Sequence, residues 1–248
     1  IYDRLVGSEM CIRDSLIDNT VPEKIQFKGE LNIGESNSEY EALRKLKEIS
    51  KKNQIYSNFI GMGYYGTYTP YVILRNILEN PGWYTSYTPY QPEVAQGRLE
   101  MLLNFQQMIV DFTGMDIANA SLLDEGTAAA EAMGLSHRLN KSDDDLVFVS
   151  ENCHPQTIDV IQTRAEPMGL KVLVGNEDKV LEQLKEDIVC GILQYPGTLG
   201  DIKDPSEAIS KIHKKNGKAI LACDLLALAK LKTPRELGAD IAVGSSQR

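Results

Sequence analysis

The sequence has few of the residues that build metal centres and disulfide frameworks. Its 248 residues include four cysteines and three histidines. No two cysteines have CxxC spacing and no two histidines have a ligand-like separation, so the pattern argues against a zinc site and against a disulfide-stapled fold. We therefore expect no bound metal, and we expect free thiols in a reducing compartment at Cys11, Cys153, Cys190 and Cys223.

The sequence also lacks excess positive charge and long apolar runs. Lysine and arginine together number 26, against 35 aspartates and glutamates, which gives a net charge of −9. This charge excludes no substrate class and no fold, but it disfavours nucleic-acid and anionic-membrane partners. No apolar stretch reaches the roughly 20 residues that a membrane-spanning helix needs. Charged residues interrupt any secretory signal near the start. We expect a cytoplasmic protein, or a mitochondrial one if the source is a eukaryote.

What is present is ordinary globular composition, with 42% hydrophobic and 25% charged residues. Residues 1–15 differ in style from the rest and contain LVGSEMCIRD, which resembles translated sequencing-adaptor sequence, so we expect a non-native leader there. Residues 16–118 are predicted to form a helical and irregular N-terminal segment, rich in Tyr and Pro between 56 and 90. Helices are expected at 39–52, 71–78 and 97–113.

From about residue 119, apolar runs alternate with helical segments. The apolar runs show no polar alternation, which indicates a mainly parallel sheet covered by helices on both faces, and hence an α/β domain over 119–248. Ligands of such sheets bind at the carboxyl ends of the strands. Strands are expected at 146–150, 171–174, 188–194, 219–223 and 241–243, and helices at 126–139, 156–167, 178–185 and 205–215.

Gly61–Gly66 matches the GxGxxG pattern of dinucleotide-binding proteins. That pattern requires a strand before it, a helix after it and an acidic residue about 20 positions later. None of these is present, so we predict an irregular glycine-rich loop and disfavour a nicotinamide-dependent dehydrogenase.

The proline-fixed segment 87–91 concentrates hydroxyl groups at Tyr87, Thr88 and Tyr90. Phenols at the rim of a pocket can donate hydrogen bonds to a carboxylate substrate. The alternative is that these aromatics fill a core beneath loops. A base-stacking platform is disfavoured, because Arg75 is the only basic residue between positions 56 and 90.

Four residues lie where α/β chemistry is expected, and each has a plain structural alternative. Gly126 and Thr127 open a predicted helix and could hold a phosphate, or could be ordinary first-turn residues. His154 follows one strand and could face a ligand or simply pack, and Asp224 follows another and could cap a helix. Taken in this order, the four are similar to the surroundings of pyridoxal phosphate, whose pyridinium nitrogen needs an acidic partner.

Residues 59–133, which include NPGW and YTPYQPE, closely resemble the P-protein of the glycine cleavage system, glycine dehydrogenase (decarboxylating). The resemblance continues through 152–157, 224–228 and 244–248, and covers roughly residues 16–248. It implies the fold of fold-type-I pyridoxal-phosphate enzymes. It also implies an oxidoreductase that decarboxylates glycine as a pyridoxal-phosphate aldimine and transfers the aminomethyl group to the lipoyl arm of the H-protein.

The resemblance is incomplete in one respect. The family has two homologous halves with the Schiff-base lysine in the second, whereas this sequence resembles only the start of the first. By that comparison Gln247 stands in the lysine's place, and an amide nitrogen cannot form the aldimine. The resemblance therefore implies a truncated and catalytically incomplete fragment, with the cofactor bound covalently in the other half.

It follows from the same resemblance that the positions Gly126, Thr127, His154 and Asp224 are a vestigial cofactor site, and that segment 87–90 reaches across an interface. The implied partners are glycine, the lipoylated H-protein and the second half of the P-protein, in a homodimer or heterotetramer. The alternative is a non-catalytic subunit that supports a separate cofactor-bearing half.

Overall fold

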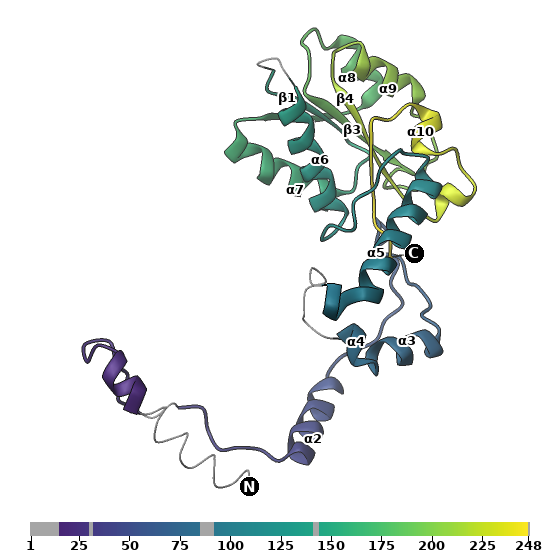
Figure 1. Ribbon diagram of the computed structural model, residues 1–248. Coiled ribbons are helices and arrows are strands. Elements are labelled where there is room, and N and C mark those ends of the chain that lie inside the picture. Colours follow the sequence, from purple (N-terminus) through teal and green to yellow (C-terminus); the bar gives the residue numbers. More distant parts are fainter. Residues whose placement is uncertain (1–14, 30–31, 85–91, 141–143, 248) are drawn as a thin grey trace. The chain divides into compact units, whose positions relative to one another are not determined.

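The computed structural model describes residues 15–29, 32–84, 92–140 and 144–247 (Figure 1). The chain divides into two compact units, residues 1–56 and 57–248. The boundary between residues 118 and 119 stays a prediction, and most of the expected leader lies outside the described residues. No helix in the described part is long and apolar enough to span a membrane.

The first unit is built around helix α2 (Glu39–Ser50), which confirms the expected helix at 39–52. A capping box begins the helix: the backbone N–H of Glu41 donates to Ser38 Oγ at 3.3 Å, and that of Ser38 donates to Glu41 Oε2 at 2.9 Å. The apolar stripe that predicted the helix is at least 50% exposed, at Tyr40, Leu43, Leu46 and Ile49. Local capping therefore defines α2, and its stripe buries nothing within the unit.

The second unit contains a five-stranded sheet in the order β2-β1-β3-β4-β5, with every pair parallel. The expected parallel sheet is confirmed. Because the chain passes from β1 outward to β2 and then returns to β3 on the other side of β1, the winding reverses between β1 and β3. The strands are β1 (Leu146–Ser150), β2 (Lys171–Gly175), β3 (Cys190–Tyr195), β4 (Lys218–Cys223) and β5 (Ile241–Val243).

Helices precede and connect these strands, and the predicted ones are confirmed with ends that shift by a few residues. The first part of the unit contains α3 (Tyr71–Leu78), α4 (Pro81–Tyr84) and α5 (Pro92–Thr113). The sheet region contains α6 (Glu125–Leu139), α7 (Pro155–Ala165), α8 (Glu177–Gln183), α9 (Ser206–His213) and α10 (Pro234–Leu237).

The core has two layers, one on each face of the sheet. Along β1, Val147 and Val149 belong to a cluster with α6 and α7, whereas Phe148 between them belongs to a cluster with α8 and α9. Figure 1 shows these helix pairs on opposite sides of the sheet. All three side chains are fully buried, and burying a side chain of this size contributes about 1.5–3 kcal/mol.

The cysteines of the described part lie in or beside this core. Cys153, Cys190 and Cys223 are free and buried, as the sequence predicts; Cys11 lies outside the described residues. Burial raises the pKa of the Cys190 and Cys223 thiols to about 12 and raises that of Cys153 further. The thiolate is the reactive form of cysteine, so these three side chains are chemically inert in the folded chain.

Candidate functional site

The carboxyl ends of the parallel strands surround a cavity of about 50 Å³, here called the carboxyl-edge cavity. It lies where the winding reverses between β1 and β3, the position at which open α/β sheets bind ligands. The lining residues come from the strand ends, from the start of α6 and from the glycine-rich loop: Gly63, Tyr65, Glu125, His154, Gln194, Pro196, Gly197, Asp224, Ser245 and Gln247.

His154 is the N-cap residue of α7, and Pro155 after it begins the helix. Its Nδ1 lies 2.8 Å from Thr198 Oγ1, and the residue is only 6% exposed. The backbone N–H of Thr198 donates to the carbonyl of Asn152 at 2.9 Å, which ties the loop after β3 to the loop after β1. Burial lowers the pKa of His154, so the neutral imidazole is favoured at neutral pH.

The loop that carries His154 is anchored to α8 through Glu177, which is 9% exposed. Ser150 Oγ donates to Glu177 Oε2 at 2.7 Å, and Asn152 Nδ2 donates to Glu177 Oε1 at 3.2 Å. This buried carboxylate therefore fixes the chain on both sides of the turn that follows β1.

Replacement of Glu177 by alanine is expected to lower the free energy of unfolding by about 2 kcal/mol, because the buried Ser150 hydroxyl and the half-buried Asn152 amide lose their acceptor. The Glu182→Ala variant on the same helix is the control, since Glu182 is exposed, and a change within about 0.5 kcal/mol is expected for it. Urea denaturation of both variants measures the difference. Equal midpoints for the two variants would contradict the anchoring role.

Glu125 begins α6 and faces the cavity with a side chain that is 15% exposed. Its Oε1 lies 3.9 Å from His154 Nε2. Burial raises the pKa of Glu125 to about 7, a hydrogen bond with the Gln194 side chain opposes this, and the negative charges of Asp224 and Asp124 add to the rise. A pKa of about 7 means that the charge of Glu125 changes near neutrality.

Two acceptor oxygens in the cavity are buried without a hydrogen-bond partner among the described residues, Glu125 Oε1 and Gln194 Oε1. Asp224 adds a further carboxylate; its Oδ1 accepts from the backbone N–H of Leu226 at 2.9 Å and of Ala227 at 3.4 Å. Asp224 thus caps the turn after β4 and lines the cavity at the same time. Beside these acceptors, the lining includes groups that can donate: the hydroxyl groups of Tyr65 and Ser245 and the amide of Gln247.

The structure brings together some of the expected site residues and separates others. His154, Asp224 and Gln247 line the carboxyl-edge cavity, whereas Gly126 and Thr127 do not. The backbone N–H of Thr127 instead donates to Asp124 Oδ1 at 2.8 Å, as in an ordinary helix cap. The expected pocket-rim residues Tyr87, Thr88 and Tyr90 lie outside the described residues.

Sequence reasoning missed Glu125 and Gln194. Both carry a signal that could have found them: Glu125 is a second carboxylate directly before the expected Gly126, and Gln194 is a polar residue at the end of an apolar strand. Gly61–Gly66 is confirmed as an irregular loop, since only an isolated bridge joins Gly61 to Tyr64.

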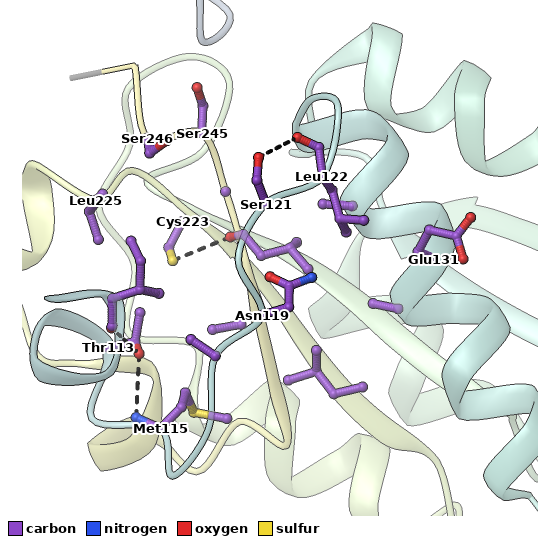
Figure 2. Close-up of a pocket in the computed structure, with 18 of the residues that line it drawn as sticks. Thr113, Met115, Asn119, Ser121, Leu122, Glu131, Cys223, Leu225, Ser245 and Ser246 are labelled. Atoms are coloured by element: carbon purple, nitrogen blue, oxygen red, sulfur yellow. Dashed lines mark hydrogen bonds between the residues drawn. The ribbon is translucent and has the colours of Figure 1, made fainter. Parts of the chain in front are cut away.

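A second and larger cavity, of about 840 Å³, runs along β5 between the end of α5, the loop at 115–124 and α6. Figure 2 shows Asn119 and Ser121 on one side of it and Thr113, Cys223 and Leu225 on the other. Cys223 Sγ donates to the carbonyl of Val243 at 3.4 Å. The walls of this larger cavity include many apolar side chains. The tail after β5 (residues 244–247) contributes residues to the lining of both cavities.

Comparison with known proteins identifies the family of the chain. The family model for the glycine cleavage system P-protein matches residues 6–248. The chain belongs to the P-protein family. It is 83% identical over 235 residues to glycine dehydrogenase (decarboxylating) of Pelagibacter ubique, and 56% identical over 236 residues to that of Stutzerimonas stutzeri. Each match covers 95% of this chain and 24% of the relative, so the chain spans about a quarter of the length of these curated relatives.

A solved structure agrees with this assignment. The crystal structure of glycine decarboxylase (P-protein) in inhibitor-bound form matches with a TM-score of 0.83 and 30% identity, over 96% of this chain and 55% of that chain. A structure of SspA in complex with cysteine matches at a TM-score of 0.53 and 16% identity, over 69% of this chain and 53% of that chain, which shows the fold alone. The expected fold of fold-type-I pyridoxal-phosphate enzymes is thereby confirmed.

The residues of the carboxyl-edge cavity do not fit pyridoxal phosphate. A cavity of about 50 Å³ holds one or two water molecules, whereas small-molecule sites measure roughly 300–1,000 Å³. No lysine is among the residues lining either cavity. The N-terminus of α6, which would otherwise attract a phosphate, presents the carboxylates of Asp124 and Glu125. An anion placed there would be repelled.

Proposed function

We propose that this chain is the N-terminal part of a glycine-decarboxylating P-protein and carries the half-site that does not hold the cofactor. The observation that supports this most directly is the match at 83% identity over 235 residues to a glycine dehydrogenase (decarboxylating) about four times as long. In this proposal the whole protein removes CO₂ from glycine and passes the remaining aminomethyl group to the lipoyl arm of the H-protein. The whole protein is a homodimer or heterotetramer in the cytoplasm.

The side chains of the carboxyl-edge cavity favour a role for this part of the enzyme that does not include holding the cofactor. Gln247 lines the cavity where the resemblance places the lysine of the other half, and the amide group cannot act as the nucleophile. Pyridoxal phosphate and its lysine then belong to the half outside this sequence. In this proposal Tyr87, Thr88 and Tyr90, which lie outside the described residues, contribute to the site of that half, and the positions equivalent to a cofactor site here are vestigial.

The alternative of a separate non-catalytic subunit is less well supported. The curated relatives are each matched over only 24% of their length, which favours one long chain that contains both halves.

Borohydride reduction in the presence of pyridoxal phosphate tests the proposal. We expect no stoichiometric pyridoxyl-lysine in the 248-residue chain by peptide mass spectrometry, because no lysine lines either cavity. The full-length Pelagibacter ubique relative is the positive control and is expected to form one adduct per chain. A stoichiometric adduct at a single lysine of the 248-residue chain would overturn the proposal, as would release of CO₂ from glycine by this chain with lipoylated H-protein.

A further inference from the structure

The turn that joins α9 to β4 contains the one Asn-Gly pair of the sequence, Asn216–Gly217. It closes as a Schellman motif, in which the N–H of Gly217 donates to the carbonyl of Ile212 at 3.2 Å. The N–H of Asn216 donates to the carbonyl of His213 at 3.0 Å in the same motif. Asn216 lies in the left-handed region with φ of 56°, which asparagine tolerates better than most residues with a side chain. The motif therefore favours asparagine or glycine at position 216.

Packing requires glycine at the next position. Gly217 is buried, and a β-carbon there would lie 2.6 Å from Cγ1 and 3.2 Å from the carbonyl oxygen of Ile188. The N–H of Ile188 donates to the carbonyl of Lys215 at 3.1 Å, so the backbone at 188 cannot withdraw without breaking this bond. The fold thus holds an asparagine followed by a glycine. Asparagine is thermally labile, most of all before glycine, because no side chain then shields the backbone nitrogen that attacks its amide.

Deamidation of this pair needs two groups that are free to react. The backbone nitrogen of Gly217 attacks Cγ of Asn216, the Cγ–Nδ2 bond breaks, and ammonia leaves with the proton of the glycine N–H. Water then opens the resulting succinimide ring, and the product at position 216 is aspartate or isoaspartate. Water is consumed and ammonia is released, with no oxidation or reduction.

In the folded chain both groups are occupied. The Gly217 N–H is bonded to the carbonyl of Ile212, and Asn216 Nδ2 donates to Asp187 Oδ2 at 2.8 Å. The charge of Asp187 also opposes the negative charge that develops on the amide oxygen during the attack. Asn216 is nevertheless exposed, so solvent reaches the amide as soon as the turn opens. The rate of deamidation therefore depends on how often this turn opens.

We propose that Asn216–Gly217 is a deamidation site which Asp187 and the Schellman motif protect, and whose reaction irreversibly loosens the turn between α9 and β4. After the reaction a carboxylate replaces the amide that donated to Asp187, so two like charges face each other at hydrogen-bond distance. Isoaspartate also adds one carbon to the backbone between positions 216 and 217, which displaces Gly217 from its place against Ile188. The turn then no longer closes as before, and the start of β4 loosens with it.

Deamidation rates of the 248-residue chain at pH 8.5, folded and in concentrated guanidinium chloride, test the protection. Mass spectrometry of a peptide that spans residues 206–224 measures the conversion of amide to acid, and chromatographic retention separates aspartate from isoaspartate. We expect the folded chain to react more slowly by about tenfold or more, because the turn must open first. Asp187→Ala should raise the folded rate by about threefold to tenfold, as expected for the loss of one hydrogen bond. Glu186→Ala, which removes the neighbouring exposed carboxylate, is the matched control and should leave the rate unchanged.

Two variants at position 216 test the consequence of the reaction. Asn216→Asp reproduces the charge of the product, whereas Asn216→Gly removes the amide and keeps a residue suited to the left-handed region. Both lose the bond to Asp187, so the difference between them isolates the like charge. Hydrogen exchange over residues 212–218 should be about threefold faster in Asn216→Asp than in Asn216→Gly, with equal protection of β1 in both. Equal deamidation of the folded and unfolded chains, equal rates in Asp187→Ala and Glu186→Ala, or equal exchange in the two position-216 variants would overturn the proposal.

Discussion

The Glu125→Gln variant is expected to be more stable than the wild type by about 3 kcal/mol at pH 8.5 and nearly equal to it at pH 4. The pKa of Glu125 is about 7 in the folded chain and 4.5 without the fold, and each pKa unit corresponds to about 1.36 kcal/mol. Because the folded state binds the extra proton, the wild type loses stability as pH rises from about 4.5 to above 7. Glutamine resembles the protonated carboxyl and removes that loss.

Urea denaturation at half-unit pH intervals measures this difference. His154 acts in the opposite direction, because its pKa is lowered in the folded chain and its contribution is lost as pH falls below 6.5. The variant keeps His154, so the difference between wild type and variant isolates Glu125. Glu131→Gln should leave the pH dependence unchanged, since its carboxylate is a half-exposed partner of Arg164. A constant difference across the pH range would show that Glu125 ionises as it does in water.

The Gly191→Ala variant is expected to destabilise the chain by about 3 kcal/mol, the upper part of the usual range for overpacking a core. A β-carbon at Gly191 would lie 2.4 Å from Cδ1 and 2.6 Å from Cγ1 of Ile212. Both residues lie in a core where side chains cannot move aside: Gly191 is in the central strand β3, and Ile212 of α9 is fully buried. The added methyl must therefore separate α9 from the sheet.

A double-mutant cycle and a matched glycine test this origin. Ile212→Val removes Cδ1, so the variant with both substitutions should be less destabilised than the sum of the two single changes. In α5, a β-carbon at the exposed Gly97 would meet no other atom within 4 Å, and Gly97→Ala should stabilise the helix by about 0.5–1 kcal/mol. Additive effects at 191 and 212 in chemical denaturation would contradict the steric explanation.

The fold could be predicted from the sequence because each strand is a short apolar run bounded by helical segments. The run Leu146–Ser150 was predicted with the bounds that the structure gives, since both faces of β1 are buried and every residue on it must be compatible with a core. The apolar stripe of α2 likewise predicted a helix. It could not predict that the stripe would remain exposed within its unit, because periodicity does not identify a partner surface.

The site was only partly predictable for a different reason. His154 and Asp224 follow strands, and position after a strand is readable in the sequence. The neighbours that give Glu125 its raised pKa and its place in the cavity are distant along the chain. The sheet topology brings Asp224, His154 and Gln194 close to it. A helix-initial glutamate is common, so the second carboxylate before Gly126 marks Glu125 as a candidate but does not indicate that its side chain is buried.

The buried thiols can be used to measure where the folded chain opens. Cys190 and Cys223 lie in neighbouring central strands, whereas Cys153 lies in the loop that carries His154. Cys223 lines the larger cavity, whereas Cys153 and Cys190 line neither cavity. An alkylating reagent reaches the sulfurs of Cys153 and Cys190 only when the structure around them opens, so the alkylation rate of each measures the free energy of that opening. If Cys153 reacts faster than Cys190, the loop beneath the carboxyl-edge cavity opens independently of the sheet. Equal rates would mean that the edge and the core open together.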